Sequence, residues 1–181
     1  ATPERTDGFN VFELFHFNTP YEIRLNHALE EDMLSPFHYY GVADVTFNDG
    51  STTTDEADLR VLISVERVDH LLQALATYGQ AGVAPRGLIF CSRTEEARQL
   101  SSELNRRTLR GQPLRTVALT GSDPVPHREA QVELLESGGL DYILTVDVFN
   151  EGVDIPTVNQ VVMLRNTKSS IVFVQQLGRG L

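Results

Sequence analysis

Four short apolar runs, separated by segments with helical spacing, constrain the fold of this chain more than any other feature of its sequence. The predicted strands are 87–92, 116–119, 142–146 and 158–164. The predicted helices are 71–78, 94–107, 126–137 and 169–177. Continuous runs of Val, Ile and Leu are typical of strands buried on both faces, and intervening helices favour parallel neighbours. We therefore predict an α/β fold: a doubly wound, mostly parallel sheet with helices on both faces.

The region in front of this pattern differs in charge. Residues 1–58 contain 12 acidic residues and 2 arginines, whereas residues 59–181 contain 13 acidic and 13 basic residues. The net charge of −10 therefore belongs to the front region, where we expect a small acidic α+β segment. Its predicted elements are strands at 11–15 and 37–42 and helices at 21–33 and from 55 onward.

The composition excludes several classes of protein. The one cysteine, Cys91, cannot form an internal disulfide, and no Cys/His spacing predicts a metal site. No apolar run reaches the roughly 20 residues that a membrane-spanning helix needs. The first residues lack the basic and apolar parts of a signal peptide. We expect a cytoplasmic protein that makes no contact with a membrane.

The residues that follow the strands form the candidate site, because ligands of doubly wound sheets bind at the carboxyl ends of the strands. Ser92 and Arg93 follow the first strand, and Thr120 and Gly121 follow the second. A helix N-terminus beside an arginine favours phosphate, and glycine allows a ligand backbone to approach closely. Taken singly, each pair is more simply explained as a helix cap or a turn. Their order along one sheet is what indicates a site.

More specific segments follow the third strand and end the chain. In the stretch 147–156, Gly152 can adopt backbone angles closed to other residues, and Asp154 can accept hydrogen bonds from a ribose or from water. Residues 175–181 place Arg179 between two glycines. Such an arginine can stabilise charge on a transferring phosphoryl group, or it can simply pair with the negative end of a helix dipole.

Together, these segments resemble the C-terminal lobe of superfamily 2 helicases. Residues 88–93 resemble motif IV, Thr120-Gly121 the small motif after it, 143–156 motif V, 175–179 motif VI, and 1–5 the end of motif III. The pattern is nearest to bacterial helicases related to the Res subunit of type III restriction enzymes. The resemblance implies that 81–181 form a RecA-like lobe cut inside motif VI. Residues 1–80 would then be an inter-lobe connection or insertion.

The resemblance also implies roles for single residues. Those facing ATP with Mg²⁺ are Gly152, Asp154, Gln175 and Arg179, with Arg179 as the catalytic arginine finger. Those contacting nucleic acid are Ser92, Arg93, Thr120, Gly121 and Thr145. We expect DNA, held through its backbone without sequence preference. Motif V often has Thr directly before Asp147, where this chain has Val146, so Thr145 lies on the other face of the strand.

The residues that would complete an ATP site are not in this sequence. A phosphate-binding loop needs Gly-Lys-Ser/Thr, and the only lysine, Lys168, follows Thr167. We therefore expect an upstream RecA-like lobe to bind most of the ATP, and this chain alone to be inactive. Two alternatives stay open: a non-catalytic module that binds a nucleotide or a protein, and a Rossmann oxidoreductase. The oxidoreductase would need a Gly-x-Gly-x-x-Gly run that the sequence lacks.

Overall fold

The computed structural model describes residues 38, 40–43, 45, 58–146 and 155–164. Apart from His38, these residues all belong to one compact unit, residues 39–180. Three predicted elements, the strand at 11–15 and the helices at 21–33 and 169–177, lie outside the described residues. The predicted helix start at 55 lies outside them as well.

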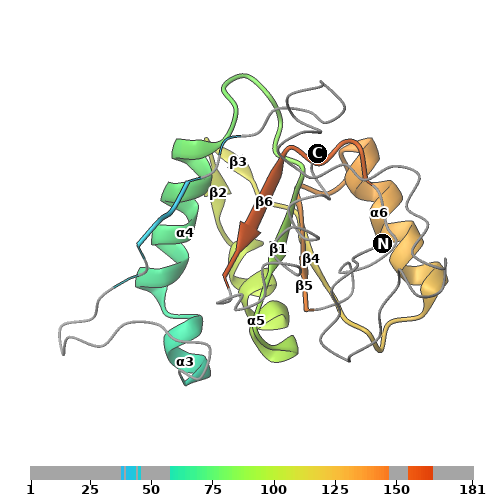
Figure 1. Cartoon of the computed structure of the whole chain (residues 1–181), viewed down its shortest axis with the longest axis horizontal. Helices are drawn as coiled ribbons and strands as arrows, with labels where there is room; N and C mark the ends of the chain where they lie inside the picture. Colours follow the sequence, from blue (N-terminus) through green and yellow to red (C-terminus); the bar gives the residue numbers. More distant parts are fainter. Residues whose placement is uncertain (1–37, 39, 44, 46–57, 147–154, 165–181) are drawn as a thin grey trace, which may run out of the picture. The chain divides into compact units, whose positions relative to one another are not determined.

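A parallel sheet of four strands lies between the helices (Figure 1). In spatial order the strands are β4 (Thr116–Leu119), β5 (Tyr142–Thr145), β1 (Gly87–Phe90) and β6 (Gln160–Met163). The register sets Tyr142 beside both Gly87 and Thr116, and Gly87 beside Gln160. The strands therefore start level at one edge and end level at the other. Each observed strand lies within its predicted range, and its ends differ from the prediction by two residues at most.

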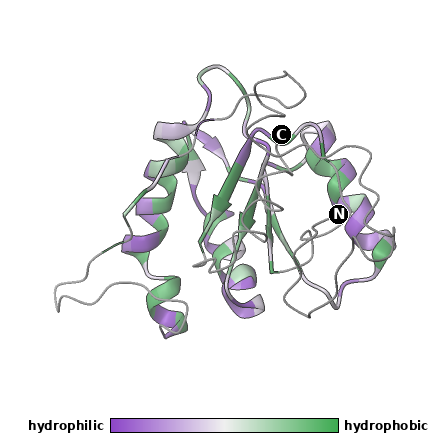
Figure 2. Ribbon diagram, viewed as in Figure 1, coloured by the Kyte–Doolittle hydropathy of each residue, from purple (hydrophilic) through white to green (hydrophobic). Residues whose placement is uncertain are grey.

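Two apolar cores, one on each face of the sheet, confirm the doubly wound architecture. Helices α4 (Val65–Tyr78) and α5 (Thr94–Leu104) pack on one face, and α6 (Val125–Ser137) packs on the other. Successive strand residues point to opposite faces, so Ile89 enters the α4/α5 core while Leu88 and Phe90 enter the α6 core. Figure 2 shows the strands of the parallel sheet as largely hydrophobic, with hydrophilic segments along the helices. Among the described residues, no helix is long and apolar enough to cross a membrane.

Helix α4 begins earlier than predicted, at Val65 instead of 71. Ser64 caps it, and the Ser64 side chain accepts a hydrogen bond from the Arg67 backbone N–H at 3.3 Å. A short helix, α3 (Leu59–Leu62), precedes it and is capped by Asp58. The prediction was late because Arg67, a charged residue, occupies a buried position on the first turn of α4 and breaks the apolar pattern.

The predicted strand at 37–42 is wrong for the residues described in the 39–180 unit. Tyr40 to Val42 form no strand. The Tyr40 ring instead stacks on Tyr78, the last residue of α4, with ring centroids 4.4 Å apart. Nearby, His70 Nε2 donates a hydrogen bond to the Ala43 carbonyl at 2.9 Å. Tyr40, one of the residues that predicted a strand, therefore packs against the end of a helix.

A small hairpin between α5 and β4 was not predicted. Helix α5 ends at Leu104, three residues before the predicted end. The hairpin joins β2 (Thr108–Leu109) to β3 (Gln112–Pro113), and its turn has positive φ at Arg110 (51°) and Gly111 (80°). The Arg110 guanidinium donates to three carbonyls at the end of α4: Ala76 (3.0 Å), Gly79 (2.8 Å) and Gln80 (3.1 Å). These bonds tie the hairpin to the negative end of the helix.

Candidate nucleic-acid interface

The residues predicted to contact nucleic acid all lie at one edge of the sheet. Thr120 follows β4, Thr145 ends β5, and Ser92 comes two residues after the end of β1. Because these strands are parallel and adjacent in the order β4-β5-β1, their carboxyl ends meet at the same edge. Backbone pairing continues just past β1, where Cys91 N–H donates to the Thr145 carbonyl at 2.9 Å. The carboxyl edge of the sheet is therefore the candidate site.

The turn after β1 is organised by the carboxylate of Glu96. Glu96 Oε2 accepts hydrogen bonds from the Ser92 backbone N–H (2.9 Å) and from Ser92 Oγ (2.8 Å). The other oxygen, Oε1, accepts from Arg67 Nη1 at 2.8 Å. Glu96 and Arg67 are both buried. The N-cap of α5 is Arg93, and its side chain makes no capping hydrogen bond.

The turn after β4 repeats this pattern at the surface. Asp123 Oδ2 accepts from the Thr120 backbone N–H (2.7 Å) and from Thr120 Oγ1 (2.8 Å). These two bonds lower the pKa of Asp123, and the nearby positive side chains of His127 and Arg98 lower it further. The N-cap of α6 is Pro124, without a side-chain hydrogen bond. Asp123 therefore binds back to its own turn instead of capping α6.

Gly121 and Thr145 differ sharply in access. Gly121 is exposed, and a Cβ added to it would meet no atom within 4 Å. Open space in front of Gly121 is what the close approach of a phosphate backbone requires. Thr145 is fully buried between Phe90 and Leu119 on the neighbouring strands. Its Oγ1 makes no hydrogen bond that the described structure shows, which costs free energy for a buried hydroxyl.

Four residues were predicted to face ATP. Gly152, Asp154, Gln175 and Arg179 all lie outside the described residues. Within the described ranges, no group of three or more His, Cys, Asp and Glu side chains is arranged to hold a metal ion. The lone cysteine, Cys91, is buried, and burial raises the pKa of its thiol far above neutral pH. Cys91 is part of the apolar core on the α4/α5 face of the sheet.

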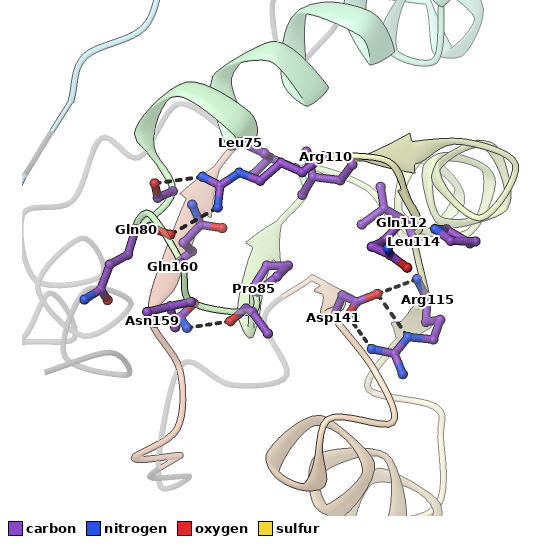
Figure 3. Close-up of a pocket in the computed structure, with 16 residues that line it drawn as sticks. Leu75, Gln80, Pro85, Arg110, Gln112, Leu114, Arg115, Asp141, Asn159 and Gln160 are labelled. Atoms are coloured by element: carbon purple, nitrogen blue, oxygen red, sulfur yellow. Dashed lines mark hydrogen bonds and ion pairs between the residues drawn. The ribbon is translucent and has the colours of Figure 1, made fainter.

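A pocket of about 650 Å³ lies near the opposite, amino edge of the sheet (Figure 3). It is bounded by the end of α4, the 79–85 loop, the hairpin and the starts of β5 and β6. Its charged groups are already paired. Arg115 Nη2 bonds Asp141 Oδ1 at 2.6 Å, and Arg110 bonds the carbonyls of α4. None of the residues predicted as site residues lines this pocket.

Three side chains that shape the carboxyl edge were not predicted: Arg67, Glu96 and Asp123. Glu95 and Glu96 lie in the first turn of α5, where the helix dipole favours acidic side chains, so their presence there gives no sign of a further partner. The partner of Glu96 lies 29 residues earlier in the sequence, on another helix. The available signal was a hydroxyl residue with an acid three or four residues later, which occurs at both turns.

Comparison with known proteins decides the family. The model of the helicase conserved C-terminal domain matches residues 65–181, well over half of the chain. The chain belongs to this family. The match also argues against the oxidoreductase alternative, and it includes the whole of α4.

Two curated relatives are similar to parts of this chain. The ATP-dependent RNA helicase SrmB of Haemophilus influenzae is 29% identical over 111 residues, which cover 61% of this chain and 24% of that protein. The pre-mRNA-splicing ATP-dependent RNA helicase PRP28 of Kluyveromyces lactis is 39% identical over 70 residues, covering 39% and 13%. This helicase lobe therefore spans about a quarter or less of the length of these relatives.

Solved structures agree on the fold. The RNA helicase Prp28 from Chaetomium thermophilum superposes with a TM-score of 0.53 and 22% identity, covering 64% of this chain and 27% of that one. A parallel sheet with flanking helices is the RecA-like fold of helicase C-terminal domains, so the predicted fold class is confirmed.

Proposed function

We propose that this chain is the C-terminal motor lobe of an ATP-dependent helicase or translocase, and that its carboxyl edge carries a nucleic-acid backbone. The observation that supports this most is the convergence of two loop sites, Ser92-Arg93 and Thr120-Gly121, at the same edge of a helicase-family sheet. Phosphate contacts of this kind position a strand without reading its bases, as tracking requires.

The hydrogen bonds of the two turns support a choice among the groups that could contact phosphate. The N–H and the hydroxyl of Ser92, and those of Thr120, all donate to carboxylates. These donors are hydrogen-bonded within the lobe, so the proposed contact rests on the charge of Arg93 and on the open space at Gly121. Arg93 brings positive charge beside one turn, and the exposed Gly121 offers close approach at the other. We assign the main attraction to Arg93 and the close steric approach to Gly121.

The ATP part of the proposal rests on the motifs and on the relatives. Gly152, Asp154, Gln175 and Arg179 would face ATP and Mg²⁺ across a cleft from a second RecA-like lobe, with Arg179 as the finger. The named relatives are ATP-dependent RNA helicases, so they do not support DNA as the substrate. The closer relation to Res subunits and the cytoplasmic location stay predictions from the sequence.

The first experiment measures binding of a fluorescent 20-nucleotide single strand to the chain by anisotropy, with RNA and DNA compared at low salt. Arg93→Ala should weaken binding about tenfold, because a charged contact is lost. Arg106→Ala is the matched control, two residues past the end of α5, where the side chain is 69% exposed and pairs with Glu103. Equal losses in the two variants, or no binding by the wild type, would refute this interface. Preference for RNA over DNA settles the nucleic-acid class.

A second substitution tests whether the nucleic-acid backbone comes close to Gly121. Gly121→Ala adds a methyl group into open space, so the thermal unfolding of the lobe should not change. Binding of the same strands should weaken several-fold if a phosphate backbone passes within contact distance of Gly121. Gly41→Ala, which also meets no atom within 4 Å, is the control. Unchanged binding by Gly121→Ala would remove the second turn from the interface.

Catalysis is tested separately, by ATP hydrolysis with and without nucleic acid. We expect the 181-residue chain alone to show no turnover, because its sequence has no Gly-Lys-Ser/Thr loop. A polypeptide that joins it to a phosphate-loop lobe should hydrolyse ATP, and Arg179→Ala should remove most of that activity. Turnover by the chain alone that depends on Arg179 would contradict the two-lobe account.

A further inference from the structure

Arg67 is a buried arginine that connects three segments at the carboxyl edge. Only 5% of the residue is exposed. Its Nη1 donates to the Leu62 carbonyl and to Glu96 Oε1, both at 2.8 Å. Its Nη2 donates to the Leu164 carbonyl, just after β6, at 3.4 Å. One guanidinium therefore joins the end of α3, the first turn of α5 and the end of β6.

Glu96 links Arg67 to the Ser92 turn by hydrogen bonds to both. Its side chain is fully buried, with one oxygen on Arg67 and the other on the two donors of Ser92. Glu96 accepts hydrogen bonds on two sides because a carboxylate has two acceptor oxygens. No other side chain of the same size offers two such acceptors. The position of the Ser92-Arg93 turn is therefore fixed through Glu96 by a residue on α4.

Stability alone does not account for this pair. Taking two charges out of water costs free energy that their attraction only partly recovers, and a well-packed apolar pair is often as stable or more so. Val68 and Ala97, the next residues on α4 and α5, already belong to an apolar core. The pair lies instead where it can set the geometry of a turn at the candidate interface.

We propose that Arg67 and Glu96 are positioning residues for nucleic-acid binding. Glu96 holds the Ser92-Arg93 turn in its shape at the carboxyl edge, and Arg67 holds Glu96. This role rests on the proposed function of the edge. It adds two residues that touch no nucleic acid themselves and act only through the turn.

The deciding variant replaces the pair by apolar residues of similar size, Arg67→Met with Glu96→Leu. It removes the ties to Ser92 but fills the core, so the lobe should unfold at a temperature close to that of the wild type. Affinity for the labelled single strand should fall about tenfold, as when Arg93 itself is lost. Amide hydrogen exchange at Ser92 should become faster, because its N–H no longer has a partner.

Single substitutions keep the test decisive if the double variant folds poorly. Glu96→Gln preserves shape but leaves one oxygen for donors on two sides, and it should weaken binding in a lobe that still melts cooperatively. Glu103→Gln, on the same helix but with a side chain 31% exposed, is the matched control and should bind as the wild type does.

The possible results separate this inference from the function on which it rests. If the wild type binds strongly and the folded pair variants bind equally well, the positioning role is overturned while the interface stands. If the wild type binds no strand, the interface fails and the role fails with it. If the pair variants bind less tightly and exchange faster at Ser92 while Glu103→Gln does neither, the positioning role is supported.

Discussion

The turns after β1 and β4 use the same local device in two different environments. In each, one carboxylate oxygen accepts from the backbone N–H and the hydroxyl of a residue one or two positions past the strand: Glu96 from Ser92, and Asp123 from Thr120. Glu96 is fully buried and paired with Arg67, whereas Asp123 is partly exposed and its hydrogen bonds lie within its own turn. The turn after β1 is therefore fixed by buried residues of the core, whereas the turn after β4 is fixed by hydrogen bonds within the turn.

This difference shows that equal hydrogen-bond patterns need not have equal energetic weight. Removing either partner of a buried ion pair costs much free energy of folding, because the charge that remains is neither paired nor solvated by water. A carboxylate near the surface exchanges its bonds for bonds to water at little cost. The first turn should be rigid and the second adaptable.

The largest expected effect is that of Glu96→Ala. It leaves Arg67 buried without its carboxylate and the Ser92 donors unpaired, so unfolding free energy should fall by about 3–5 kcal/mol. Urea denaturation measures this loss. Asp123→Ala, the equivalent change in the other turn, should cost about 1 kcal/mol. Similar losses for the two variants would show that burial does not separate the turns.

Removing the hydroxyl groups should give the same ranking at lower magnitude. Ser92→Ala deletes a donor to a buried carboxylate and should cost about 2 kcal/mol. Thr120→Val keeps the shape of the side chain and deletes a donor to a more exposed carboxylate, so about 1 kcal/mol is expected. The same denaturation experiment checks both, and a reversed order would contradict the comparison.

The smallest expected effect is a dependence of the lobe's stability on pH, caused by Asp123 in the turn after β4. The folded-state pKa of Asp123 is lowered, mainly by the two donors of Thr120. Its stabilising contribution is therefore fully present above the unfolded value of about 3.9 and is lost as the pH falls through the folded-state value. The difference in melting temperature between the wild type and Asp123→Asn should shrink below about pH 4. A difference that grows on acidification would contradict this sign.

The sequence predicted the fold better than the site. Continuous apolar strands such as 142–146 placed the sheet, and the carboxyl-edge rule brought Ser92 and Thr120 together. The sequence-based prediction placed the start of α4 too late, because Arg67 is charged yet buried. It also missed the pairing of Arg67 with Glu96, because contacts between helices depend on packing that no local pattern records. The turn at Arg110-Gly111 was missed because Arg is uncommon at positive φ.

The most direct test of the central claim is amide hydrogen exchange of the chain with and without a saturating single strand of the preferred nucleic acid. Protection on binding should appear at 92–97 and 120–124, the turns of the carboxyl edge, and not in the hairpin at 108–113 beside the opposite edge. Protection confined to the hairpin and the amino-edge pocket, with the two turns unchanged, would contradict the account.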